Sequence, residues 1–297
     1  MIGLARFVMR GRLQALLVAV AGAGSLLFSW ISAAAIALVA MRRGPGAGLW
    51  LLMWAVFPAA AVLAMTGDSG PLSLLVGTTV LAVVLRVSVS LPLAVLAAVP
   101  VGLATGALTL ALGGPLLDQV VAFFDQFLTS VEQQMAANGQ AVTALPRPTP
   151  LQVAGMLGAA NGLLSVVCLL LARWWQAALY NPGGFGVEFR ALYYPPAAAA
   201  AMLLGALALV GMGLEYRPWA VIVTLPLMFA GLGLLHAWVR RRGRGRGLLV
   251  GFYLAWMLFD LVKLAVVGLA LADSWLRWRQ RWGDDTDESG NDGHSRD

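Results

Sequence analysis

The sequence predicts an all-α membrane protein, a polytopic bundle of eight or nine transmembrane helices with one amphipathic helix on its surface. Hydrophobic residues make up 60% of the 297 residues and charged residues only 11%, whereas soluble domains carry roughly 25% charged residues. The apolar segments are continuous over about 20 residues, the length that a helix needs to cross a bilayer. Because lipid offers no partners for backbone polar groups and the apolar–polar alternation of barrel strands is absent, the spans should be helical.

The first apolar segment, residues 13–40, is longer than one span requires. Basic residues flank it (Arg12 at its start, Arg42 and Arg43 at its end), and small residues lie in its middle. It forms either one long tilted helix or a broken pair of short helices that turn near residues 25–30. The apolar stretch is too long for a signal-peptide core of about 7–15 residues, so we expect an uncleaved span.

Further apolar segments follow along the chain, separated by turn-forming glycine, proline and asparagine residues. They predict spans over residues 49–65, 72–87, 91–112, 151–179, 195–214, 219–239 and 248–272. This gives eight spans, or nine if the first segment is broken.

Residues 116–137 differ from the spans because apolar residues recur there at helical spacing while Asp118, Asp125 and Glu132 lie seven residues apart. This pattern predicts an amphipathic helix that lies on the membrane surface or caps the bundle; a coiled-coil seam is the alternative. Its acidic face carries no basic residue, so we expect it on the outer side, away from the anionic cytoplasmic leaflet. Residues 138–150 read as a loop. Helix and loop form an insertion in one transmembrane domain, residues 1–282.

The distribution of basic residues favours the broken first segment. With a cytoplasmic N-terminus and eight spans, the basic residues divide equally between the two sides. A broken first segment places twice as many inside as outside, as the positive-inside rule requires. It also leaves Arg277, Arg279 and Arg281 outside, so the side of the C-terminus stays open. The acidic tail, residues 283–297, is expected to be disordered.

Few residues offer catalytic or metal-binding chemistry. A single cysteine, Cys168, and two histidines exclude an internal disulfide and a Cys/His zinc cluster. The chain has no HExxH motif and no phosphate-binding loop followed by Lys-Ser or Lys-Thr. The alternating tryptophans and arginines of residues 275–282 fit an anchor at the membrane interface better than a nucleic-acid surface. We therefore expect no enzyme, no cofactor, no metal and no nucleic-acid partner.

Four polar residues within spans are candidates for binding, because ionisable groups at membrane depth are costly. Asp260 and Lys263 share a helix face; they contact a substrate or proton, or form a neutralised pair that fixes packing. His236 titrates near neutral pH or is a satisfied interface residue. Asn161, among glycines, makes an interhelical hydrogen bond or lines a cavity.

Residues 173–190 form the densest cluster of specified residues. Tryptophan and tyrosine suit the headgroup zone, and Asn-Pro-Gly-Gly at residues 181–184 forms a turn. Glu188 and Arg190 pair with each other or bind a partner. The candidates in this block are Arg173, Trp174, Trp175, Tyr180, Asn181, Glu188 and Arg190, and a binding role and a membrane-anchor role carry equal weight.

The 173–190 block, together with residues 230–236, 251–253 and 272–275, resembles the proteobacterial branch of the YybS-like family of membrane proteins. The resemblance implies a distant similarity to the substrate-binding (S) components of energy-coupling-factor transporters. Such proteins bind a small molecule among their helices and dock on a transmembrane coupling partner with ATPases. Gly44-Pro45 matches the Gly-Pro that follows a short second helix in them, whereas the amphipathic insertion and the extra C-terminal spans are departures.

The sequence therefore predicts a protein of the bacterial inner membrane that binds or transports a small solute. Its partners would be the lipid bilayer and other membrane proteins or a transport-coupling module. The alternative is a structural or assembly protein that recruits partners through the amphipathic helix and the 173–190 block. The first hypothesis predicts that Asn161, Asp260 and Lys263 line one cavity, whereas the second predicts a tightly packed interior.

Overall fold

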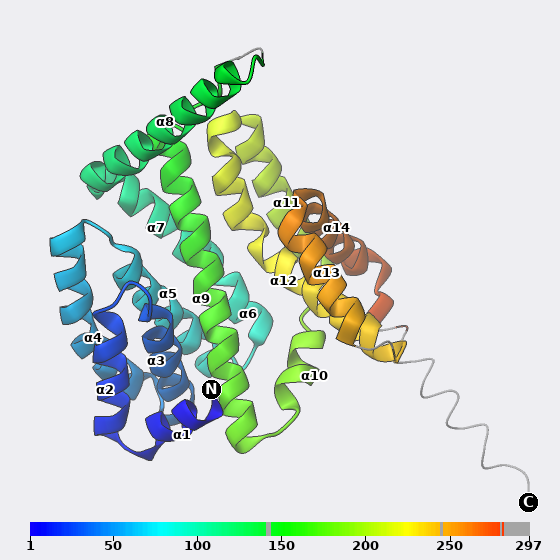
Figure 1. The fold of residues 1–297 in the computed structure, drawn as a ribbon. Helices are drawn as coiled ribbons and strands as arrows, with labels where there is room; N and C mark the ends of the chain where they lie inside the picture. The colour runs from blue at the N-terminus through cyan, green and yellow to red at the C-terminus, as the bar shows by residue number, and fades with distance from the viewer. Residues whose placement is uncertain (141–143, 244–245, 280, 282–297) are drawn as a thin grey trace, which may run out of the picture.

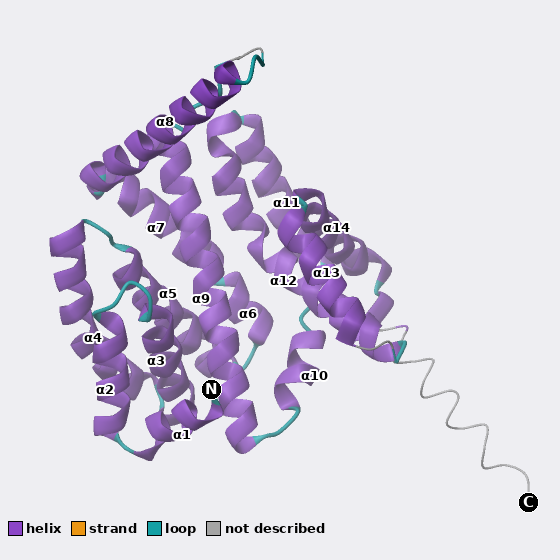
Figure 2. Cartoon of the chain, viewed as in Figure 1, coloured by secondary structure: helices purple, strands orange, loops and turns teal. Residues whose placement is uncertain are grey.

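In a computed structural model, the chain folds into a bundle of helices (Figures 1 and 2). The structure describes residues 1–140, 144–243, 246–279 and 281. Every regular element in these ranges is helical, which confirms the all-α prediction. The predicted acidic tail, residues 283–297, lies outside the described residues.

The first apolar segment is broken, as the alternative with two short helices predicted. After α1 (Ile2–Arg10), α2 (Arg12–Ala23) and α3 (Ser29–Arg43) pack against each other and are joined by residues 24–28. A Cβ on Gly22 would lie 2.9 Å from the Ser32 Cβ, so the two helices touch through this glycine. The Ser32 hydroxyl donates to the Ala19 carbonyl at 2.5 Å. Helix α3 occupies the centre of the N-terminal half, between α2, α4, α5 and α9.

The next three apolar segments are helices, close to their predicted bounds. They are α4 (Pro45–Thr66), α5 (Gly70–Ser88) and the pair α6 (Leu91–Leu96) and α7 (Ala98–Leu112). Gly44 has a φ of +104°, which an L side chain rarely adopts, so the turn from α3 into α4 needs a glycine here. Pro45 then begins α4, where proline is tolerated.

The amphipathic segment forms α8 (Gly114–Ala137), which lies across one end of the bundle (Figure 1). Its acidic face is not free of basic partners. Arg147, from the chain that returns toward α9, forms ion pairs with Asp125 at 3.1 Å and with Glu132 at 2.6 Å. The pattern of the helix alone does not reveal this neutralisation, because Arg147 lies outside the helix.

Helix α9 (Pro150–Tyr180) runs through the middle of the molecule and makes its most extensive packing with α7. Thr149 and Gln152 form a capping box at its start. Gly102 and Gly158 allow the two backbones to approach closely, since a Cβ on Gly158 would lie 2.5 Å from the Gly102 carbonyl oxygen. After α9 come α10 (Gly184–Arg190), α11 (Pro196–Gly211), the 3-10 turn η1 (Leu214–Tyr216) and α12 (Arg217–Arg241).

Residues 248–272, predicted as one span, form two helices instead of one continuous helix. This segment forms α13 (Arg246–Leu258) and α14 (Asp260–Leu276), and the chain bends by 116° between them. Phe259 has an extended backbone, and Asp260 is the first residue of α14. An acidic residue in the first turn complements the positive end of the helix dipole and marks a helix start.

Five helices of the described chain are long and apolar enough to cross a membrane, or six if the bent pair counts as one span. They are Pro45–Thr66, Gly70–Ser88, Leu91–Leu112, Pro150–Tyr180 and Leu214–Arg241. Helices Arg12–Ala23 and Pro196–Gly211 are apolar but shorter. These lengths fit a membrane protein, whereas the count of eight or nine spans is not confirmed.

Charge separates the two ends of the bundle. One end, here called the basic end, holds α1, the start of α2 and the last turns of α3, α5, α10 and α12 (Figure 1). Its arginines include Arg10, Arg12, Arg42, Arg43, Arg86, Arg190, Arg240 and Arg241. The opposite end, here called the acidic end, holds α8 and η1 with Asp118, Asp125, Glu132 and Glu215, and also the two arginines Arg147 and Arg217.

Candidate functional site

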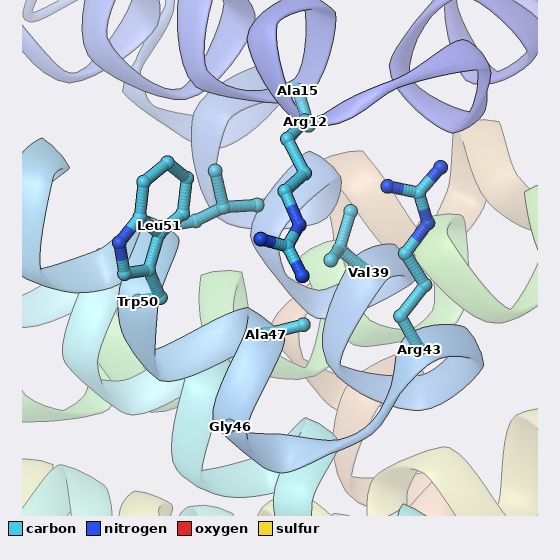
Figure 3. Close-up of a pocket in the computed structure, with 8 residues that line it drawn as sticks. All are labelled: Arg12, Ala15, Val39, Arg43, Gly46, Ala47, Trp50 and Leu51. Carbon is cyan, nitrogen blue, oxygen red and sulfur yellow. The ribbon is translucent and has the colours of Figure 1, made fainter.

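The larger of two described cavities lies at the basic end, between α2, α3 and α4 (Figure 3), and has a volume of about 440 Å³. Its lining residues are Arg12, Ala15, Val39, Arg43, Gly46, Ala47, Trp50 and Leu51. A cavity of this size falls within the roughly 300–1,000 Å³ of small-molecule pockets.

The broken first segment builds this cavity. Arg12 is the first residue of α2 and Arg43 is the last of α3, so the hairpin brings the two side chains to one end. A Cβ on Gly48 would clash with the side chain and Cα of Ala40, so α4 starts directly against α3. The first turns of α4 supply Ala47 and Trp50 as the facing wall.

The cavity is positively charged and its walls are apolar. Figure 3 shows the Arg12 guanidinium pointing among Val39, Ala47, Trp50 and Leu51. Arg12 forms no hydrogen bond or ion pair with any described residue, whereas one Arg43 nitrogen donates to the Met9 carbonyl at 2.7 Å. None of the described lining residues is acidic. The sequence reading treated both arginines only as flanks of a span; their places at the two ends of a broken hairpin were the available signal.

A smaller cavity of about 120 Å³ lies beside the 173–190 block. Met41, Leu85, Arg86, Val89, Arg173, Gln176 and Glu188 line it. Glu188 forms an ion pair with Arg173 across 2.7 Å, and Arg173 also donates to Gln176 at 3.4 Å. Glu188 therefore pairs with Arg173 and not with Arg190, which was one of the two alternatives, because the turn at residues 181–184 folds α10 back against the last turns of α9.

The other candidates of this block have different environments. Trp175 is 0% exposed and belongs to the core, so it is not a headgroup anchor, whereas Trp174 is 36% exposed. The Arg42 guanidinium lies over the Tyr180 ring, with 4.1 Å between its Cζ atom and the ring centroid. Asn181 ends α9, and its backbone N–H donates to the Ala177 carbonyl.

Arg190 contributes to the fold through its backbone and does not pair with Glu188. Burial and the neighbouring charge of Arg240 lower the pKa of its guanidinium. Its carbonyl oxygen accepts a hydrogen bond from Arg279 at 2.9 Å.

Asn161 makes an interhelical hydrogen bond. It is 7% exposed on α9, and its side-chain amide donates to the Thr105 hydroxyl on α7 at 2.7 Å. This contact corresponds to the packing alternative from the sequence.

Asp260 and Lys263 form an ion pair at 2.6 Å. The pair is exposed and is not buried within a continuous transmembrane helix. The Asp260 side chain is 91% exposed and that of Lys263 is 44% exposed. Because the pair lies in the first turn of α14 while Asn161 is buried against α7, the three residues do not share a cavity.

His236 belongs to an aromatic cluster. Its Nδ1 lies 2.9 Å from the Leu232 carbonyl oxygen. Its ring is 5.5 Å from Phe189 and 6.0 Å from Tyr253, between centroids. The contacts fit a satisfied interface residue that joins α10, α12 and α13.

A deeply buried ion pair was not among the candidates predicted from the sequence. Asp273 on α14 is 0% exposed and accepts from Arg279 Nε at 2.8 Å. Burial lowers the pKa of the Arg279 guanidinium, and the Asp273 carboxylate opposes this effect. The signal was an acidic residue in an apolar segment, followed six residues later by an arginine.

Among the described residues, no group of three or more His, Cys, Asp or Glu side chains could hold a metal ion. Comparisons with protein families, with curated proteins and with solved structures find no match.

Proposed function

We propose that this chain is a multi-span protein of the bacterial inner membrane that binds a small solute at its basic end. The observation that carries the proposal is the cavity between α2, α3 and α4, with a volume of about 440 Å³. It combines apolar walls with the charged groups of Arg12 and Arg43, as small-molecule pockets do. The solute-binding role thus moves from Asn161, Asp260 and Lys263 to the N-terminal hairpin.

We place the basic end at the cytoplasmic face, because cytoplasmic loops carry an excess of arginine and lysine. In this arrangement α4, α5, α6–α7, α9, α11 and α12 cross the bilayer. The short pairs α2–α3 and α13–α14 enter from the cytoplasmic side and return to it. Arg279, which donates to the Arg190 carbonyl, then lies inside with the N-terminus. This removes the orientation conflict that a straight last span creates for Arg277, Arg279 and Arg281.

The resemblance to the YybS-like family extends the proposal toward transport. In the S components to which that family is distantly similar, a solute-binding helical protein works with a separate coupling partner. For this chain the partner, like the family membership, is part of the proposal.

The test is to purify the full chain from its native membranes in a mild detergent and identify retained small molecules by mass spectrometry. Ala47→Trp places a large ring in the cavity and should abolish retention of the molecule, while Ala208→Trp, on an exposed face of α11, should not. Equal retention by both variants at equal thermal stability would refute a solute site in this cavity.

A second function, assembly of a membrane complex, is favoured by α8. Phe123 and Phe127 on this helix are 64% and 54% exposed. Under this alternative, the double variant Phe123→Ser, Phe127→Ser loses co-purifying envelope proteins while Ala47→Trp keeps them. Loss of the retained molecule with unchanged partners would instead support the solute-binding role.

A further inference from the structure

An exposed aromatic stripe runs along α4 from the rim of the larger cavity. Trp50, Trp54 and Phe57 recur at the spacing of one helix face. The ring centroids of Trp50 and Trp54 are 6.4 Å apart, and those of Trp54 and Phe57 are 6.1 Å apart. All three side chains are exposed, by 40%, 44% and 64% respectively. Trp50 belongs to both the stripe and the cavity wall, so the two features are continuous.

The cavity holds positive charge that the described protein does not neutralise. Arg12 points toward apolar side chains and has no hydrogen-bond or ion-pair partner among the described residues. Arg43 uses one nitrogen on the Met9 carbonyl and keeps other donors. Both arginines are exposed at the rim of the cavity, so their free N–H donors can reach an anion that enters from solvent. An anion between the two arginines would accept hydrogen bonds from both.

Two features indicate which kind of anion fits the cavity: the planar shape of the guanidinium groups and the neighbouring aromatic stripe. Planar guanidinium groups bind phosphate oxygens in pairs and carry permanent charge. Trp50, Trp54 and Phe57 continue from the cavity as an apolar track that fits hydrocarbon. Lipid-facing aromatics are common on membrane spans, but here they begin at a cavity with two arginines.

We propose that the larger cavity binds the phosphate of an amphiphile, with the phosphate between Arg12 and Arg43 and the hydrocarbon chain along Trp50, Trp54 and Phe57. The inference rests on the solute-binding function proposed above and names the class of ligand. The cavity lies at the basic end, where helix termini meet the headgroup level, so a phosphate there keeps its chain at hydrocarbon depth.

The experiment compares three probes on the purified full chain in a non-ionic detergent, with binding followed by native mass spectrometry. Phosphatidylglycerol carries both a phosphate and acyl chains, dioleoylglycerol carries the chains alone, and glycerol phosphate carries the phosphate alone. We expect phosphatidylglycerol to bind more tightly than either of the others.

Arginine variants then locate the phosphate. Arg12→Gln and Arg43→Gln should each weaken binding of phosphatidylglycerol about tenfold or more, because hydrogen bonds to charged groups contribute substantially to affinity. Arg12→Lys should recover part of the loss, since lysine keeps the charge but not the paired donors. Arg10→Gln is the matched control: this exposed arginine, two residues before Arg12, lies outside the cavity and should leave binding unchanged.

Three outcomes would overturn the inference. If dioleoylglycerol binds as tightly as phosphatidylglycerol, the site does not recognise a phosphate. If glycerol phosphate binds as tightly, the ligand is a soluble phosphate ester and not an amphiphile. If Arg10→Gln weakens phosphatidylglycerol binding as much as the cavity variants do, the effect comes from the general positive charge of the basic end. In the first two cases Ala47→Trp would still block the probe, so the proposed solute-binding function would survive. Undiminished binding of every probe to Ala47→Trp would refute that function as well.

Discussion

Arg279 and Asp273 form an ion pair in which the carboxylate is 0% exposed and the Arg279 side chain 12% exposed, with 2.8 Å between Nε and Oδ2. The same guanidinium donates to the carbonyls of Arg190 and Leu192 and, at 3.1 Å, to that of Ala230. One side chain therefore ties the end of α14 to the segment after α10 and to α12. This tie holds the bent α13–α14 pair against the bundle.

Removing the Asp273 carboxylate should strongly destabilise the protein. Asp273→Ala leaves a buried guanidinium without its counter-charge, and breaking a buried pair in this way costs about 3–5 kcal/mol. Asp260→Ala is the matched control on the same helix, because the Asp260 side chain is 91% exposed; its effect should stay within about 0.5 kcal/mol. Thermal unfolding of both variants in detergent, followed by size exclusion, measures the difference. Equal stability of the two variants would show that the tie does not hold the bent pair.

The ion pairs of Arg147 should control the segment that returns from α8. The hydrogen bond from Arg147 and then that from the Leu145 backbone N–H hold the pKa of Glu132 at about 2, below its ordinary 4.5. Glu132→Ala should therefore speed hydrogen exchange of the Leu145 amide several-fold at neutral pH. Asp118→Ala, on the same helix but outside this contact, should leave the exchange rate unchanged.

The pH dependence of this contact follows from the direction of the shift. Because the folded-state pKa of Glu132 lies below its ordinary value, the carboxylate favours the folded contact at pH values above about 4.5. This contribution declines as the pH falls from 4.5 toward 2. The exchange rate of the Leu145 amide, corrected for its intrinsic pH dependence, should thus stay constant from pH 7 to 5. A rise already between pH 7 and 5 would contradict the assignment.

Gly158 should be essential for the contact between α7 and α9. A Cβ at this position would lie 2.5 Å from the Gly102 carbonyl oxygen and 3.1 Å from the Gly106 nitrogen, both backbone atoms that cannot rotate away. Gly158→Ala should lower the free energy of unfolding by about 1–3 kcal/mol, as overpacking does. Gly268→Ala on α14 meets no atom within 4 Å and should be neutral or stabilising by up to about 1 kcal/mol. Thermal denaturation of the two variants separates these outcomes. An equal loss of stability in both would show that the effect of Gly158→Ala does not depend on the close contact between α7 and α9.

Periodicity and apolar length located most helices because both are local properties of the chain. Residues 116–137 were predicted as an amphipathic helix, and α8 spans Gly114–Ala137. The small residues of the first apolar segment predicted a turn near residues 25–30, and the hairpin turns at residues 24–28. The break in the last segment was not predicted because its apolar run continues through Phe259. Asp260 was read as a buried charge, although an acidic residue is also a helix-start signal.

The site was harder to foresee because it depends on contacts between distant segments. Arg12 and Arg43 look like ordinary span flanks until the hairpin brings them to one cavity. Likewise, Arg147 meets Asp125 across 22 positions of the chain, and no helical spacing encodes that pair. Glu188 pairs with Arg173, although Arg190 is nearer in sequence, because the turn after α9 reverses the chain.

The topology can be tested by single-cysteine labelling, because the native Cys168 is 2% exposed and gives little background. Ser130→Cys on α8 should react with a membrane-impermeant maleimide added to intact cells. Arg10→Cys and Arg281→Cys should react only after the inner membrane is permeabilised. Both residues are exposed; Arg10 lies at the basic end, and Arg281 follows Arg279, which contacts the last turn of α10 at that end. The Arg281 result is decisive for the last hairpin. If α13–α14 returns to its side of entry, this residue shares the side of Arg10; labelling of Arg281→Cys in intact cells would mean that the bent pair crosses the membrane as one span.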